Sequence, residues 1–216
     1  MELSKKERDE IAIEAGLQLI PAVGGALATL YFGRKQEIRL KRLEQFYAQI
    51  SDELRKIQDK FPPIKSHDEE SLLSIIDKLN EKIEVENVEN KINFLKTYLK
   101  NTLLFPVTED NFDKRTIFLN IISELTVFEC RILLRINSLK EDETVSSLDI
   151  SKENECNEYY AGSVMHRLRN FGFIKKDSKG MIYSGDFDSA LLDRFKISDF
   201  GKEFILFCLQ QDEDAN

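Results

Sequence analysis

The strongest constraint on the fold is a heptad repeat that begins at Leu40. Apolar side chains recur at alternating steps of three and four residues, which is the spacing of an a/d seam along one face of a helix. The seam consists of Leu40, Leu43, Tyr47, Ile50, Leu54, Ile57 and Phe61. Pro62 and Pro63 follow and are expected to end the helix. The repeat predicts a helix over residues 40–61, which packs as one stripe of a bundle or, as the alternative, against a second copy of the chain.

Helical periodicity continues along most of the chain. Asp68 is a suitable N-cap for the next helix, and a further helix is expected before Phe105. Residues 107–113 form a polar connector and the expected domain boundary, and one long helix is predicted over residues 117–139. Charged residues make up 32% of the chain and there are only 9 glycines and 4 prolines, which favours long solvated helices. We therefore predict a mainly α protein whose residues 1–106 form a helical bundle or hairpin.

The C-terminal part of the chain has a different order of elements. A helix through YYAGSVMHRLRN is expected to end at Gly172 in a left-handed cap, and the residues that follow, FIKK, have the composition of a strand. Two further strands are expected over residues 181–183 and 194–197, and Ser198 is placed to cap a last helix.

This order resembles the winged-helix pattern, in which a recognition helix is followed by a β-hairpin wing and a final helix. The sequence departs from the pattern at residues 184–193, where SGDFDSALLD lengthens the wing. The resemblance implies a winged-helix-like domain over residues 112–210, which an acidic tail over residues 211–216 follows.

A winged helix implies a DNA-binding or partner-binding face on its recognition helix. The candidates are His166, Arg167, Arg169, Asn170, Lys175 and Lys176. Residues 117–216 nevertheless hold 12 Lys and Arg against 18 Asp and Glu, and the whole chain has a formal net charge of −8. Because DNA binding depends on the neutralisation of phosphates by cations, we expect a protein partner rather than DNA at this face.

Residues 15–33 carry no charged side chain and are followed directly by a basic cluster. As a helix these residues would measure about 28 Å, close to the thickness of a bilayer core. The large apolar members are Leu17, Leu19, Ile20, Val23, Leu27, Leu30, Tyr31 and Phe32. The basic flank consists of Arg34, Lys35, Arg39, Lys41 and Arg42, the type of cluster that inner-membrane lipid attracts. Pro21 and several glycines dilute the hydrophobicity, so a buried helix inside a soluble bundle stays an equal alternative.

The sequence offers no recognisable catalytic motif. It contains no P-loop, no GxGxxG and no GxSxG, and its three cysteines lie far apart without a CxxC pair. We therefore expect no enzyme activity, no cofactor, no metal site and no small-molecule substrate. The expected location is the cytoplasm or the cytoplasmic face of the inner membrane, since no secretory signal is visible.

The layout as a whole resembles the Abi-alpha type of abortive-infection protein from bacteria and their mobile elements. The resemblance rests on LIPAVGGALATLYFG with its basic follow-on RKQEIRLKR, on KINFLKTYLKNTL, on FPVTEDNFDKRTIFLNIISELTVFECRIL, and on the winged-helix-like end. It implies a phage-defence effector that acts at the inner membrane through its N-terminal apolar segment, and it assigns no residue a catalytic role. A soluble winged-helix regulator or interaction scaffold, with possible DNA binding, is the alternative.

Overall fold

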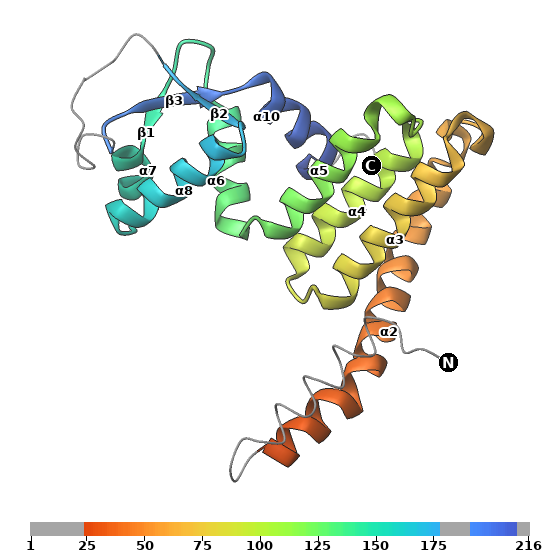
Figure 1. Ribbon diagram of the computed structural model, residues 1–216. Coiled ribbons are helices and arrows are strands. Elements are labelled where there is room, and N and C mark those ends of the chain that lie inside the picture. The colour runs from red at the N-terminus through yellow and green to blue at the C-terminus, as the bar shows by residue number, and fades with distance from the viewer. Residues whose placement is uncertain (1–23, 178–190, 211–216) are drawn as a thin grey trace.

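The computed structural model describes residues 24–177 and 191–210, with side chains from Glu37 onward, and these residues are mainly helical (Figure 1). A long helix, α2 (Gly24–Lys56), packs against α3 (Glu69–Val85) and α4 (Glu89–Leu104). Helix α5 (Glu109–Glu124) completes this bundle by packing against α3 and α4. Two short turns, η1 (Gln58–Lys60) and η2 (Ile64–Ser66), connect α2 to α3. The mainly α class predicted for the chain is confirmed.

Helix α2 meets the bundle along a line close to the one the heptad predicted. Of the predicted seam, Ile50 is almost completely buried and Leu43 and Leu54 pack against the core, whereas Leu40 and Tyr47 are 61% and 38% exposed. Phe46, which was not part of the seam, is buried in place of Tyr47. The helix also ends at Lys56, before the Pro62–Pro63 pair that was expected to stop it.

The helix predicted over residues 117–139 is divided into α5 and α6 (Val127–Asn137). Thr126 and Glu129 cause the division, because they form a capping box at the start of α6. The Glu129 N–H donates to Thr126 Oγ1 at 3.2 Å, and the Thr126 N–H donates to Glu129 Oε2 at 2.8 Å. Helix α6 then packs against α8 and β3 rather than against α3 and α4. The change of neighbours therefore falls near residue 126, and residues 109–113 of the predicted connector belong to α5.

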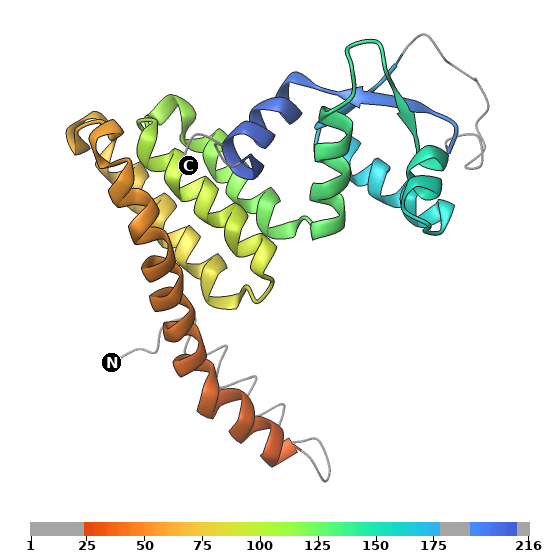
Figure 2. The ribbon, with the colours of Figure 1, turned by 180° about the vertical axis from the view of Figure 1, so that it is seen from behind.

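The C-terminal elements form a small sheet that lies across a group of helices at one end of the molecule (Figures 1 and 2). In chain order they are β1 (Val145–Ser146), α7 (Ser147–Glu153), α8 (Glu158–Asn170), β2 (Ile174–Lys176), β3 (Arg194–Ile197) and α10 (Asp199–Phe204). The sheet is antiparallel in the order β1-β3-β2, with Val145 opposite Phe195 and Lys175 opposite Lys196.

The local signals predicted for this region are present. Gly172 has a φ of 78°, and the Ser198 side chain accepts the N–H of Gly201 at 2.9 Å to cap α10. The strand predicted at residues 194–197 is β3, whereas the one predicted at residues 181–183 lies outside the described residues.

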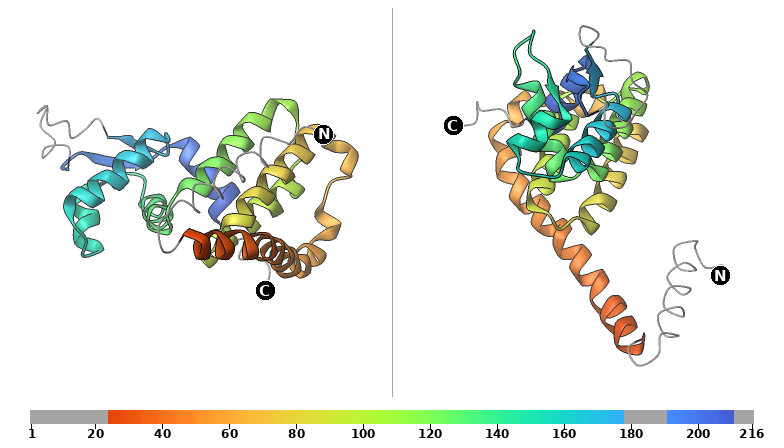
Figure 3. Two further views of the ribbon diagram at one scale, coloured as in Figure 1. Left: turned by 60° about the horizontal axis from the view of Figure 1, so that its bottom comes forward. Right: turned by 90° about the vertical axis from the view of Figure 1, so that its left-hand side faces the viewer.

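The chain then returns to the bundle. After α10 a π-helical turn, η4 (Ile205–Leu209), lies against α4, and Asn101 of α4 donates through Nδ2 to the carbonyls of Leu206 at 3.3 Å and Phe207 at 2.9 Å. One hydrophobic core therefore runs through both parts of the molecule, while the N-terminal part of α2 projects away from it (Figure 3).

Candidate functional site

The predicted membrane segment lies only partly within the described residues. Those outside are Leu17, Leu19, Ile20 and Val23. Those on the projecting part of α2 are Leu27, Leu30, Tyr31 and Phe32 (Figure 1). Among the helices that the structure describes, none is long and apolar enough to cross a membrane.

The residues of the basic flank differ in whether they contact the bundle. Arg39 Nη1 lies 3.7 Å from the Glu84 carboxylate of α3, and Arg42 Nη1 donates to the Glu84 carbonyl at 2.9 Å. These two cations therefore hold α2 against α3. Lys41 is exposed, and Arg34 and Lys35 belong to the projecting part of α2.

The predicted partner face on α8 is exposed as expected, but its arginines are not equivalent. His166, Arg169 and Asn170 are exposed, as is Lys175 on β2. Arg167 instead forms an ion pair, with Nε 3.0 Å from Glu129 Oε1, and the Glu129 side chain is only 3% exposed. Arg167 therefore compensates a buried carboxylate.

Most cations of the adjoining sheet are also paired with carboxylates. Lys176 Nζ lies 2.7 Å from Asp193 Oδ1, and Arg194 Nη1 lies 3.5 Å from Asp149 Oδ2. Lys196 Nζ similarly lies 3.6 Å from an Asp177 oxygen. Of the six residues predicted for this face, Arg169 and Lys175 are the cations that form no ion pair within the described part of the chain. The region therefore offers little uncommitted positive charge to a phosphate backbone.

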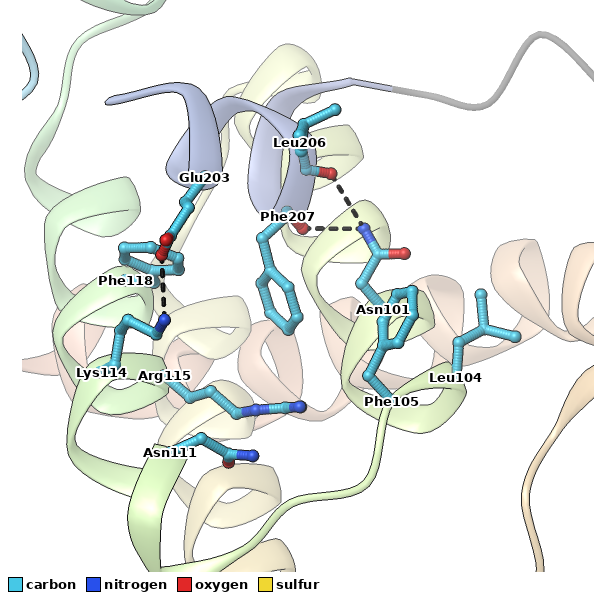
Figure 4. Close-up of a pocket in the computed structure, with 10 residues that line it drawn as sticks. All are labelled: Asn101, Leu104, Phe105, Asn111, Lys114, Arg115, Phe118, Glu203, Leu206 and Phe207. Atoms are coloured by element: carbon cyan, nitrogen blue, oxygen red, sulfur yellow. Dashed lines mark hydrogen bonds and ion pairs between the residues drawn. The ribbon is translucent and has the colours of Figure 1, made fainter. Parts of the chain in front are cut away.

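A cavity of about 530 Å³ lies elsewhere, between α4, α5 and η4 (Figure 4). Its apolar wall consists of Leu104, Phe105, Phe118, Leu206 and Phe207. Its polar lining consists of Asn101, Asn111, Lys114, Arg115 and Glu203. Lys114 Nζ lies 2.9 Å from Glu203 Oε2, so these two charges cancel at one side of the cavity.

Arg115 is the unusual group in this cavity, because it is only 6% exposed and forms no ion pair with any described residue. Its Nη2 donates to the Pro106 carbonyl at 3.0 Å, and its guanidinium lies 5.0 Å from the centroid of the Phe207 ring. Nη1 is buried and has no hydrogen-bond partner among the described residues. Burial lowers the pKa of Arg115, and the interaction with Tyr98 partly opposes this effect. The guanidinium nevertheless stays protonated at any physiological pH.

The loop beside Arg115 contains a buried histidine. The Val107 N–H donates to His67 Nδ1 at 3.2 Å, and the Val107 carbonyl accepts the N–H of Asp68 at 2.7 Å. Burial lowers the pKa of His67, and the charge of Arg115 lowers it further. His67 must therefore be neutral for its Nδ1 to accept the hydrogen bond from the Val107 N–H. No group of three or more His, Cys, Asp or Glu side chains suits a metal ion in the described ranges.

The sequence interpretation missed both Glu129 and Arg115, for different reasons. The T-V-F-E signature of a capping box was present at Thr126–Glu129, although the apolar periodicity around it favoured an unbroken helix. Arg115 has no comparable signal. Its burial results from η4 lying against α4, which places Phe207 over its guanidinium.

The fold and these sites define a mainly helical protein with a small α/β end and an amphipathic cavity in its bundle. Comparisons of the chain with models of known families, with curated proteins and with solved structures find no match. The Abi-alpha and winged-helix resemblances therefore remain predictions from the sequence.

Proposed function

We propose that the chain is a non-enzymatic phage-defence effector of the abortive-infection type, which docks on the cytoplasmic face of the inner membrane. The observation that carries the proposal is the projection of α2 from the bundle (Figure 3). This projecting part holds the uncharged and largely apolar residues 26–33, and the basic residues Arg34 and Lys35 come directly after them. Apolar and basic residues side by side suit the interface of an anionic membrane.

The structure narrows the set of cations available for docking. Arg39 and Arg42 are engaged with Glu84, so their replacement would disturb the packing of α2 on α3. The docking charge is therefore assigned to Arg34, Lys35 and Lys41. Each basic residue near an anionic surface contributes about 1 kcal/mol, and the three together account for an affinity change of roughly 100-fold.

Co-sedimentation with vesicles that contain phosphatidylglycerol tests this assignment. The variant Arg34→Glu, Lys35→Glu, Lys41→Glu should lose binding, whereas Lys60→Glu, Lys65→Glu, Lys202→Glu carries the same charge change on exposed body positions and should bind like wild type. Survival of phage-infected cells that express each protein links docking to defence. Equal sedimentation of the two triple variants would contradict electrostatic docking through α2, and wild type that changes no infection outcome would contradict the defence function.

A soluble interaction module is the second candidate, and the C-terminal elements favour it. The order helix, strand, two helices, two strands and helix, with the sheet order β1-β3-β2, is what a winged-helix domain requires. The pairing of Arg167, Lys176 and Lys196 with carboxylates supports a protein partner over DNA. The exposed residues Leu40 and Ile38 are available for the alternative of a homo-oligomer.

Fluorescence anisotropy with duplex DNA separates these alternatives. We expect weak binding at 50 mM salt that disappears at 200 mM, and a further loss in Arg169→Ala, Lys175→Ala. A nanomolar complex that persists at 200 mM salt would establish DNA binding and contradict the partner-protein interpretation. Light scattering of the same sample determines the oligomeric state.

A further inference from the structure

The cavity between α4, α5 and η4 contains a buried cation without an anion. Arg115 is 6% exposed, and its Nη1 has no acceptor among the described residues (Figure 4). A guanidinium that is buried without a carboxylate partner lowers the stability of the fold unless its N–H groups find other acceptors. The Pro106 carbonyl and the Phe207 ring supply part of this compensation. The unused donor leaves room for a further acceptor, and the unpaired positive charge of Arg115 favours an acceptor that carries negative charge.

The net charge of the lining limits the charge of the ligand. Lys114 and Glu203 form an ion pair at 2.9 Å, so together they contribute no net charge to the cavity. Arg115 then leaves one positive charge, which suits a monoanion better than a polyanion. A carboxylate matches this requirement, because its two oxygens pair with the planar fork of a guanidinium.

The apolar walls of the cavity indicate the chemistry of the remainder of the ligand. Leu104 and Phe105 line the cavity at the end of α4, and Leu206 and Phe207 line it from η4 (Figure 4). A cavity of about 530 Å³ is within the usual range for small organic ligands. An inorganic anion would leave this apolar surface unfilled, whereas an organic acid with an aliphatic or aromatic body would cover it.

We propose that this cavity binds a small organic monocarboxylate, whose carboxylate pairs with Arg115 and whose apolar body packs between Phe105 and Phe207. Because Nη1 is shielded from solvent, the ligand carboxylate reaches it only after a rearrangement of neighbouring side chains. Phe105 is suited to this movement because it lines the cavity and is 56% exposed. The site is separate from the projecting part of α2 and from the α8 face, so it does not depend on the proposed membrane function.

Isothermal titration calorimetry on the full chain tests the proposal with octanoate as the probe. Octanamide has the same shape without the charge, and inorganic phosphate has charge without the apolar body. We expect octanoate to bind at least 10-fold more tightly than octanamide, because charge-assisted hydrogen bonds are about twice as strong as neutral ones. Phosphate should give no measurable binding. Equal affinity for octanoate and octanamide, or binding of phosphate as tight as that of octanoate, would overturn the proposal.

Variants locate the binding to this cavity. Arg115→Gln should weaken octanoate binding about 10-fold or more, while Arg131→Gln removes an exposed arginine of α6 and should bind octanoate like wild type. Leu104→Trp narrows the cavity without touching Arg115 and should also weaken binding, and Leu73→Trp on the exposed face of α3 is its matched control. Unchanged binding in both Arg115→Gln and Leu104→Trp would place octanoate elsewhere and overturn the assignment.

Discussion

Buried charge is compensated in the C-terminal region but only partly compensated in the helical bundle. In the C-terminal region the buried carboxylate of Glu129 accepts from Thr126 and pairs with Arg167, so its charge is compensated within the fold. In the bundle Arg115 is buried with a carbonyl, an aromatic ring and a donor that has no described acceptor. The charge of Glu129 is therefore compensated within the fold, whereas the proposed carboxylate ligand would supply the acceptor that Arg115 Nη1 lacks among the described residues.

Two arginines show that the role predicted from the sequence and the contacts seen in the structure can differ. Arg167 was predicted to belong to a DNA-binding or partner-binding face, and in the structure it also forms an ion pair with Glu129 at the start of α6. Arg115 looked like an ordinary helix residue, yet it lines the cavity in the bundle. A residue predicted for a binding face can thus also have a structural contact, and a residue without any sequence pattern can line a cavity.

The packing of α10 within the C-terminal region should respond most strongly to mutation. A Cβ on Gly201 would collide with the main-chain carbonyl of Phe173, which cannot move easily because it also accepts the N–H of Ser198 at 2.9 Å. We expect Gly201→Ala to lower the free energy of unfolding by about 3 kcal/mol or more.

Urea unfolding followed by circular dichroism measures this effect. Gly162→Ala is the matched control, because its Cβ would meet only the movable end of the Leu191 side chain. We expect that change to stay within about 1 kcal/mol of wild type. A Gly201→Ala protein as stable as Gly162→Ala would show that the packing of α10 on Phe173 is looser than described.

Removal of the Glu129 carboxylate should have the next largest effect. Glu129→Ala deletes the capping box and leaves Arg167 without its partner, for an expected loss of about 2 kcal/mol in unfolding free energy. The value is below that of a fully buried pair because Arg167 is 44% exposed. Exposed Glu124→Ala should change stability by less than about 0.5 kcal/mol. Similar losses of unfolding free energy in Glu129→Ala and Glu124→Ala would show that the contacts of Glu129 with Thr126 and Arg167 do not stabilise the fold.

The pH dependence of stability that His67 contributes should be a smaller effect than the two losses of unfolding free energy above. Since the pKa of His67 is lowered by burial, the unfolded chain binds this proton before the folded chain does. The stabilisation from His67 is then complete above pH 6.5, the ordinary pKa of histidine, and is lost as the pH falls from 6.5 towards the lower folded value. Thermal unfolding from pH 7.5 to 5 should show this decline, and His67→Gln should flatten it. An identical pH profile for the variant would assign the decline to other groups.

Much of the fold followed from the sequence, because the signals were local. The Asp68 cap, the Gly172 turn, the Ser198 cap and the strand at residues 194–197 each depend on a few neighbouring residues. Apart from the capping box at Thr126–Glu129, whose local signal was overlooked, the errors arose where tertiary packing decides. Tyr47 leaves the predicted seam and donates to Asn80 at 2.7 Å, and η4 lies against α4 through contacts about a hundred residues apart in the chain. The cavity depends on those contacts, so no sequence pattern could indicate it.

The role proposed for Arg115 in ligand binding is best tested by the unfolding free energy of Arg115→Met, measured with and without octanoate. Methionine retains the packing volume and removes the buried charge, and the Pro106 carbonyl keeps Asn111 Nδ2 as a donor at 3.0 Å. We expect the variant to be as stable as wild type or more stable without octanoate, and we expect octanoate to stabilise wild type but not the variant. A variant that loses 2 kcal/mol or more, together with a wild-type protein that octanoate does not stabilise, would show that Arg115 is a structural group and contradict the claim.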